Sequence, residues 1–486
     1  MRRQPSSEHY LWPIAYLSGA GRRAVVTATC MAVAFCLAGC WDRTEVDDIA
    51  FVTGIGLDAA PGNQVYVTFH IAVPRALAGG GGPGGGGGSG GGTQQTTLIT
   101  TLMGRSVVGV VNLMNAYVDR RPSFVHGKVI VIGEALARRG VAPYISELVR
   151  FRETRRTMFL VVAKGTAKEF MERNRPVIEQ NPTKNLELLA LTNRQTGLVP
   201  PSQLHRFLVE MQSLGEEPLV ILAGVKEERP GGRTEQGRGG QEESTGVSQD
   251  GGEGGQDGVK DGQPKEPSKF PEPPPRPTRT DEDYTAGTSP RAGGNPVEFL
   301  GAAVFRGDRM AGEISGDEVR AVLLLRGTFK RGIAASTDPF VESRYVSYDV
   351  RLARPTQIKI TRSGQSFHVQ VKIMLEGEVI GTQTRVDYSN PKNLRTLEKH
   401  LAAEIKKFAQ DTIKKAQTDF QADIFAFGNK ARHLTTTWQQ WVDLDWPEKF
   451  PRASIDVDVS VELRRTGLLF KPPAPTPRRE PDGSEG

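Results

Sequence analysis

The residue best placed to do chemistry is Cys40. It closes an apolar run over residues 24–38 (AVVTATCMAVAFCLA), and Leu37, Ala38 and Gly39 stand immediately before it. A branched apolar residue followed by two small ones and Cys is the pattern of a lipobox. There the thiol is alkylated by a diacylglyceryl group, and small side chains let the signal peptidase cut before Cys. Since two acyl chains give lasting membrane attachment, the sequence predicts that Cys40 is the lipid-bearing first residue of the mature chain.

The segment before Cys40 has the layout needed to deliver it to that chemistry. Arg22 and Arg23 precede the apolar run, as the basic region of a secretory signal does. The run is too short to cross the roughly 30 Å of bilayer hydrocarbon comfortably as a permanent anchor. Residues 1–39 are therefore predicted to be a lipoprotein signal peptide. The plainer alternative is an ordinary signal peptide, or an uncleaved helix with an incidental cysteine.

The rest of the chain offers no catalytic constellation. No cysteine follows Cys40, which excludes disulfides, thiol nucleophiles and Cys-ligated metals from the mature chain. The seven histidines show no HxH, HxxxH or HExxH spacing, and there is no GxxxxGK[ST] phosphate loop. We therefore predict no catalytic residue, no metal site and no cofactor besides the diacylglycerol on Cys40, and hence no enzyme.

Two motif matches fail on their context. Residues 54–59 (GIGLDA) fit the dinucleotide pattern GxGxxA, but that motif needs a helix after the second glycine, and here a turn at residues 60–63 and another strand follow. Residues 87–91 fit GxSxG only because they lie in the glycine tract 79–92. A nucleophile elbow needs a strand before it and a helix after it. The tract is predicted to be a flexible loop between two strands.

Three further groups of residues have both a functional and a structural interpretation. Asp456 and Asp458 are paired carboxylates, which suits metal or acid–base chemistry, but a solvated strand face explains them more simply. The charged run at residues 147–156 is a solvated helix face or a partner-binding one. Four of the five tryptophans are suited to a membrane interface or a partner, while core packing is the alternative for the last three of them; they are Trp41, Trp438, Trp441 and Trp446.

Composition sets the domain organisation. The formal net charge is +6, and basic and acidic residues alternate along most of the chain, which argues against a nucleic-acid partner. Residues 226–294 contain almost no aromatic or branched apolar residues and are predicted to be a disordered linker. The expected domains are thus an N-terminal one over residues 40–225 and a C-terminal one over 295–470. Residues 471–486 are expected to form a disordered tail.

In the N-terminal half the apolar periodicity alternates between strand and helix. Strand–helix–strand at this spacing predicts a βαβ unit with parallel strands. The expected strands are residues 49–55, 65–73, 96–102, 128–132 and 158–163, and the expected helices are 105–118 and 134–150, the second interrupted near Pro143.

In the C-terminal half, Ser315 and Glu318 predict a capping box that starts a helix. Asn390 and Pro391 start a long amphipathic helix that extends to Phe420 and packs on a sheet. The expected strands are residues 299–305, 346–352, 358–360, 367–375 and 455–463. The predicted fold class is α+β, with several domains of mixed sheets and packed helices.

The opening of the mature chain resembles a known family. Residues 40–58 (CWDRTEVDDIAFVTGIGLD) are similar to the start of the Ger(x)C lipoproteins, the C subunits of bacterial spore germinant receptors. The matching residues are Trp41, Asp42, Arg43, Gly54, Gly56 and Asp58. Further similar segments follow in family order at residues 126–134 (HGKVIVIGE), 148–156 (LVRFRETRR), 301–313 (GAAVFRGDRMAGE) and 417–428 (QTDFQADIFAFG).

The resemblance implies a non-enzymatic, membrane-anchored receptor subunit with a multidomain α+β fold. Its partners would be an A-type and a B-type receptor subunit, and its place the outer leaflet of the spore inner membrane. The glycine tract and the 226–294 insertion depart from the family pattern and are expected to lengthen loops. The alternative is a solute-binding lipoprotein that feeds a transporter, although such proteins usually have two α/β lobes. A surface-anchored hydrolase lacks a nucleophile, base or metal set.

Overall fold

The computed structural model describes residues 19–37, 45, 48–73, 97–179, 181–191, 193–226 and 283–465. Residues 1–49 and 50–486 form two units, each taken by itself. The first contains α1 (Gly19–Leu37), which covers nearly all of the predicted apolar signal segment. In the part of the chain that the structure describes, no helix has both the length and the hydrophobicity to cross a membrane.

Within the described residues, nine strands form the first sheet, in the order β3-β2-β1-β5-β6-β7-β8-β9, with β4 paired to β1. The parallel pairs β1–β5, β5–β6 and β6–β7 form its centre, and antiparallel pairs flank them. The strands are β1 (Ile49–Ala59), β2 (Val65–Ala72), β3 (Thr97–Gly104), β4 (Arg121–Ser123), β5 (Val129–Gly133), β6 (Phe159–Ala163), β7 (Leu219–Val225), β8 (Val297–Arg306) and β9 (Arg309–Ile314).

Helices cover both faces of this sheet, which explains why its central strands are buried throughout. On one face a core joins apolar residues of α3 (Val107–Met114), α4 (Glu134–Arg139), α5 (Ala142–Arg150) and α9 (Leu204–Met211) to the strands. On the other face α6 (Ala167–Arg173) and α7 (Pro182–Leu191) pack against β5, β6 and β7. The predicted βαβ unit is confirmed, because β5 and β6 are parallel and α4 and α5 connect them.

The first sheet extends beyond the predicted domain boundary at residue 295. Strands β8 and β9 pair in sequence onto β7, so residues 297–314 belong to the first sheet. The prediction placed strand 299–305 correctly, but alternation within a strand does not say which sheet the strand joins. Strand β7 also went unpredicted. Its sequence LVILAGV is apolar throughout and therefore has no two-residue period.

The second sheet contains five strands in the described part of the chain, in the order β10-β11-β13-β12, with β14 paired to β13. Strand β13 is central, because β11 and β12 pair in turn along one of its edges and β14 runs parallel along the other. The strands are β10 (Gly332–Asp338), β11 (Val341–Leu352), β12 (Gln357–Ser363), β13 (Ser366–Thr382) and β14 (Ser454–Arg465).

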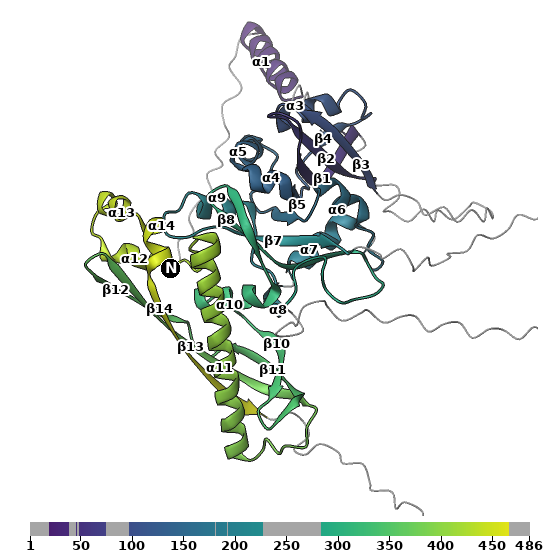
Figure 1. The fold of residues 1–486 in the computed structure, drawn as a ribbon. Helices are drawn as coiled ribbons and strands as arrows, with labels where there is room; N and C mark the ends of the chain where they lie inside the picture. The colour runs from purple at the N-terminus through teal and green to yellow at the C-terminus, as the bar shows by residue number, and fades with distance from the viewer. Residues whose placement is uncertain are drawn as a thin grey trace, which may run out of the picture. The chain divides into compact units, whose positions relative to one another are not determined.

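One face of the second sheet packs against α11 (Pro391–Lys415), which lies along it (Figure 1), together with α10 (Gly316–Arg326). Both predicted helix starts are confirmed. Ser315 and Glu318 form the reciprocal capping box of α10, and the Asn390 side chain accepts from the backbone N–H of Lys392. The predicted long helix leaves α-helical geometry at its end, where residues Ala416–Phe420 form a π-helical turn.

The face of β14 that points away from α11 is exposed to solvent, as the alternation predicts. Asp456 and Asp458 are exposed while Val457, Val461 and Leu463 are buried. Of the C-terminal tryptophans, Trp441 and Trp446 are core residues and Trp438 is 60% exposed. Short helices complete the chain; they are α8 (Asn193–Thr196), α12 (Gly428–Ala431), α13 (Trp438–Leu444), α14 (Trp446–Lys449) and the 3-10 turns Arg432–Leu434 and Phe450–Arg452.

Candidate functional site

The predicted acylation site lies outside the described residues. Ala38, Gly39, Cys40, Trp41, Asp42 and Arg43 all fall there, and Leu37 is the last residue of α1. The glycine tract 79–92 also lies outside them. The acylation of Cys40 therefore stays a prediction, and the resemblance residues that the structure places are Gly54, Gly56 and Asp58.

These three residues lie in β1, in the strand before a turn and the antiparallel β2. No helix follows the second glycine, which agrees with the rejection of a dinucleotide site. Gly56 is required by close packing, because a Cβ there would lie 2.8 Å from Met171 Sδ and 3.2 Å from Ala167 Cβ. The glycine thus lets α6 approach the strand closely.

Asp58 fixes the start of α6. Its Oδ1 accepts from Ala167 N at 2.7 Å and its Oδ2 from Lys168 N at 3.0 Å, so it satisfies two N–H groups that the helix leaves unpaired. Burial raises the pKa of Asp58 above its ordinary value, and the two backbone hydrogen bonds and the Lys168 charge oppose that rise. The carboxylate is a structural cap that joins a strand to a helix more than a hundred residues away.

A second buried polar group centres on His70 in β2. Its Nδ1 is 2.9 Å from Thr183 Oγ1, which is itself 2.9 Å from Thr53 Oγ1, and Thr53 donates to the His70 carbonyl at 3.1 Å. Burial lowers the pKa of His70 to about 4, so the imidazole is neutral at pH 7. All three side chains are buried, and the network ties α7 to the sheet.

The segment at residues 417–428 forms a third polar group, around Asp423. Its carboxylate is buried and accepts four hydrogen bonds; the donors are Phe425 N (3.0 Å), Phe427 N (3.3 Å), Gly428 N (2.8 Å) and Trp446 Nε1 (2.8 Å). Gln417 donates to the carbonyls of Phe450 and Ala453 at 2.9 and 2.8 Å. Burial raises the pKa of Asp423 to about 6, against the effect of these donors.

Asp423 stands where the two sheets of the larger unit meet. Its backbone carbonyl accepts from Glu217 N at 2.9 Å, and Glu217 precedes β7 of the first sheet. The Glu217 carboxylate accepts from Gly307 N at 2.7 Å. Burial raises the pKa of Glu217 to about 7, with Asp423 adding to the rise and Arg306 and the Gly307 hydrogen bond opposing it.

A buried arginine completes this junction. Arg326 ends α10, and its Nε donates to the Ile424 carbonyl at 2.7 Å. Its Nη1 pairs at 3.1 Å with Glu210 of α9, which Arg206 also contacts at 2.7 Å. The Arg326 and Glu210 side chains are only 5% and 3% exposed. We call Glu210, Glu217, Arg326 and Asp423 the polar junction, since together they link the first sheet to the C-terminal segment.

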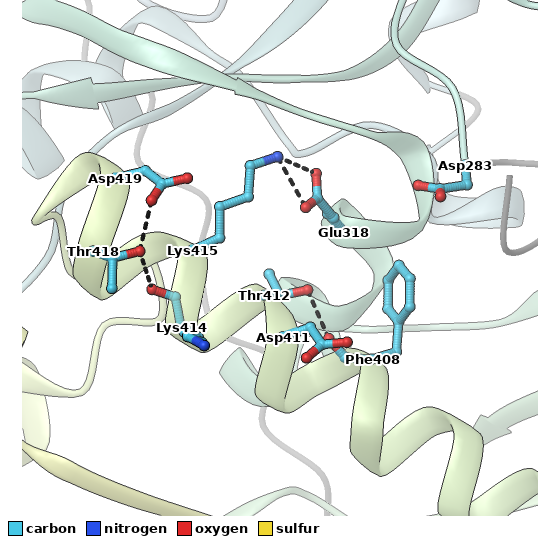
Figure 2. A pocket seen from close by; sticks show the side chains of 9 residues that line it. All are labelled: Asp283, Glu318, Phe408, Asp411, Thr412, Lys414, Lys415, Thr418 and Asp419. Carbon is cyan, nitrogen blue, oxygen red and sulfur yellow. Dashed lines mark hydrogen bonds and ion pairs between the residues drawn. The ribbon is translucent and has the colours of Figure 1, made fainter. Parts of the chain in front are cut away.

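Figure 2 shows a pocket of about 410 Å³ between α10 and the end of α11. Lys415 Nζ reaches both oxygens of Glu318 at 2.9 and 2.8 Å, and Glu318 also serves the capping box of α10. The Thr418 hydroxyl is 2.6 Å from Asp419 Oδ1 and 3.0 Å from the Lys414 carbonyl, two alternative acceptors for its single hydrogen. Each of these polar side chains is therefore engaged by a neighbour within the protein. Its lining is Asp283, Glu318, Phe408, Asp411, Thr412, Lys414, Lys415, Thr418 and Asp419.

Among the described residues, no group of three or more His, Cys, Asp or Glu side chains could hold a metal ion. What sequence reasoning missed is the polar junction. Asp423 lies in a segment singled out by the resemblance, but nothing local marks Glu210, Glu217 or Arg326. The only available signal was that charged residues flank apolar runs, and many solvated residues share it.

Two family models match the chain. The one described as "Spore germination protein N-terminal domain" matches residues 42–224. The one described as "Spore germination B3/ GerAC like, C-terminal" matches residues 300–467. The first match begins two residues after Cys40, and the two together include both sheets.

Two similar curated proteins match over nearly their whole length. The chain is 22% identical over 449 residues to "Putative spore germination protein YfkR" of Bacillus subtilis (strain 168), covering 90% of this chain and 94% of the relative. It is 24% identical over 462 residues to "Spore germination protein KC" of the same organism, covering 93% and 98%. A solved structure, "Crystal Structure of the GerBC protein", matches at 16% identity with a TM-score of 0.45, over 87% of this chain and 100% of that chain.

Proposed function

Because this chain belongs to the Ger(x)C family of spore germination proteins, we propose that it is the lipid-anchored C subunit of a spore germinant receptor. The observation that carries the proposal is that both family regions occur in order and that the first begins at residue 42, just after the lipobox cysteine. The relatives named above are spore germination proteins that match over nearly their whole length.

The proposed role is scaffolding or signalling, without catalysis. The two acyl chains of the diacylglyceryl group on Cys40 confine the folded part to the outer face of the spore inner membrane. Confinement to that plane raises its effective concentration for integral A-type and B-type subunits by a large factor without any new contact. The polar junction supports a scaffold, since hydrogen bonds and an ion pair among its largely buried groups tie the first sheet to the C-terminal segment.

The test compares three tagged full-length chains in sporulated cells: wild type, Cys40→Ala and Cys36→Ala. Cys36 lies in the same apolar run but outside the lipobox, so its variant is the matched control. We expect wild type and Cys36→Ala to incorporate a clickable fatty acid and to bring down two integral membrane proteins after detergent extraction. Cys40→Ala should do neither.

Two results would contradict the proposal. Fatty-acid incorporation that survives Cys40→Ala would place the acyl group elsewhere. A wild-type chain that is acylated, remains alone in the pull-down and retains a small solute would instead favour a solute-binding lipoprotein.

A further inference from the structure

One end of the first sheet concentrates loops and positive charge. The parallel strands β1, β5 and β6 all begin there, because Gly54 pairs with Val129 and Val129 with Phe159. The loops that lead into β5 and β6 contact each other through the rings of Phe124 and Phe151, whose centroids are 5.3 Å apart. We call this end of the sheet the basal surface.

The basal surface is rich in arginine. Arg120 and Arg121 lie before β5, and Arg152, Arg155 and Arg156 lie before β6; all but the half-buried Arg120 are exposed. Within the described residues none of the five guanidinium groups forms an ion pair or a hydrogen bond.

The acidic groups in these two loops are Asp119 and Glu153. The Glu153 carboxylate is already engaged, accepting from Phe124 N at 2.8 Å. Counted over these two loops, five arginines against two carboxylates leave a net positive charge, which complements an anionic partner.

Exposed apolar side chains lie at the same end. Leu98 of β3 pairs with Ile71, which pairs with Val52 of β1, so Leu98 stands level with the beginning of β1. Tyr117 follows α3, and its hydroxyl is 3.0 Å from Thr100 Oγ1 on β3. Val125 lies in the loop beside Phe124. Leu98, Tyr117 and Val125 are 46%, 48% and 39% exposed. An aromatic and two aliphatic residues beside arginines form the composition typical of a membrane interface.

Chain length brings this end to the bilayer. Cys40, the proposed lipid attachment site, precedes Ala50 by ten residues, which span about 35 Å at full extension. The buried part of β1 begins at Ala50, at the basal end of the sheet. A lipid anchor on Cys40 thus holds the basal surface within reach of the headgroups. The opposite end of the sheet is farther away by the length of β1, about 35 Å for its eleven residues.

We propose that the basal surface docks on an anionic lipid bilayer, with Leu98, Tyr117 and Val125 at the interface and the five arginines on lipid phosphates. This inference rests on the proposed lipid anchor and adds an orientation to it. One anchor alone leaves the domain free to tumble above the membrane. Docking would present a fixed face of the sheet to partners in the same membrane.

The experiment measures which end of β3 contacts lipid. The proposed mature chain has no cysteine besides the acylated Cys40, so one new cysteine carries a fluorophore cleanly. The acylated full-length protein is labelled at Leu98→Cys or Tyr117→Cys. Controls are Met103→Cys and Val108→Cys, 46% and 40% exposed, toward the other end of the same strand and helix. The vesicles contain phosphatidylcholine and about 30% phosphatidylglycerol, with a nitroxide quencher on the lipid.

We expect lipid quenching at positions 98 and 117 to be severalfold stronger than at 103 and 108, and to disappear in pure phosphatidylcholine vesicles. A triple variant, Arg152→Gln with Arg155→Gln and Arg156→Gln, should weaken docking about a hundred-fold, at roughly five-fold per arginine. The matched control removes three exposed arginines from the C-terminal half: Arg344→Gln, Arg354→Gln and Arg385→Gln. It should leave the quenching pattern unchanged.

Each other result overturns the inference in a distinct way. If the protein floats with the vesicles but all four positions are equally quenched, the anchor stands and the docking does not. If position 98 is protected only when integral receptor subunits are added, the arginines bind an acidic protein instead. If the protein does not float with the vesicles, the lipid anchor itself fails and the docking fails with it.

Discussion

Two buried aspartates, Asp58 in the first sheet and Asp423 beyond α11, both accept hydrogen bonds from backbone N–H groups, but they connect different amounts of the structure. Both are nearly inaccessible to solvent, at 6% and 4% exposed. Asp58 accepts two backbone N–H groups and joins strand β1 to α6, a helix that packs on the same sheet. Asp423 accepts three backbone N–H groups and an indole N–H, and its own carbonyl bonds to the first sheet.

The comparison shows what determines the destabilisation that follows when a carboxylate is removed. Its size and its spread through the structure depend on how many hydrogen bonds the carboxylate accepts and on where the donors lie. Loss of Asp58 exposes one helix end, which solvent can partly satisfy. Loss of Asp423 leaves four donors without an acceptor in a core, and an unsatisfied buried donor costs the full desolvation of that group. A buried aspartate thus stabilises one helix start in the first sheet, whereas at the polar junction it stabilises contacts between distant parts of the chain.

The largest expected effect is that of Asp423→Ala. We expect the free energy of unfolding to fall by about 3–5 kcal/mol, because four buried donors lose their acceptor. Urea unfolding followed by tryptophan fluorescence measures it. Asp419→Ala, an exposed carboxylate in the same segment, should change the value by less than about 0.5 kcal/mol. If the two variants lowered the free energy of unfolding equally, a carboxylate at the polar junction would contribute no more to stability than one on the surface.

The second effect is a pH dependence at the junction. The folded pKa of Glu217, about 7, lies above the ordinary carboxyl value of 4.5. Between these values the folded state binds more protons than the unfolded state, so this group makes stability fall as pH rises. We expect a loss of about 2 kcal/mol from pH 4.5 to 7.5, reduced from the full shift because the side chain is half-buried.

Glu217→Gln removes that titration and keeps the side-chain shape. The unfolding free energy of the variant, measured across the same pH range, should lack the Glu217 contribution. His70 titrates in the opposite sense, since its pKa is lowered to about 4 and its contribution rises with pH from about 4 to 6.5. A slope that is the same in wild type and Glu217→Gln would contradict the assignment.

A smaller effect is expected at the local cap. Asp58→Asn keeps one carbonyl oxygen for a single N–H of α6 and puts an amide where the second acceptor was. We expect a loss of about 1–2 kcal/mol, with increased amide hydrogen exchange confined to α6. If increased exchange were also found in β7 or in residues 417–428, the loss of Asp58 would destabilise distant parts of the structure too, which would contradict the proposed difference between the two aspartates.

The smallest effect is expected on the wet face of β14. Asp456 is exposed, and its Oδ2 lies 3.5 Å from His368 Nε2 in a contact open to solvent. Asp456→Ser should change the unfolding free energy by less than about 0.5 kcal/mol, measured by the same urea titration. A loss near that of Asp58→Asn would mean that this carboxylate is not merely solvated.

The sequence predicts those parts of this fold that rest on local patterns. The capping box at Ser315, the helix start at Asn390 and the alternating strand β14 are all confirmed, since each depends on neighbours within a few residues. Strand β7 and helix α7 were missed. An evenly apolar strand has no period, and α7 begins at Pro182 in a polar stretch.

The junction could not be predicted because its contacts are distant in sequence. Arg326 and Glu210 are 116 residues apart, and Asp58 and Ala167 are 109 apart. Gly56 and Asp58 could be singled out by resemblance, but the helix that they accommodate could not. Nothing in a single sequence couples such pairs before the chain folds.

The pairing of β7 with β8 has a consequence for how this gene can change. Val225 pairs with Val297, and Lys226 N donates to the Pro296 carbonyl at 2.8 Å, so the two ends of the long intervening sequence meet as at the mouth of a hairpin. Closing a loop costs only about 0.6 kcal/mol more for each doubling of its length. The sheet therefore tolerates almost any amount of sequence at this position. We therefore expect an affinity tag or a reporter domain inserted between residues 227 and 282 to leave the register of β7 and β8 unchanged.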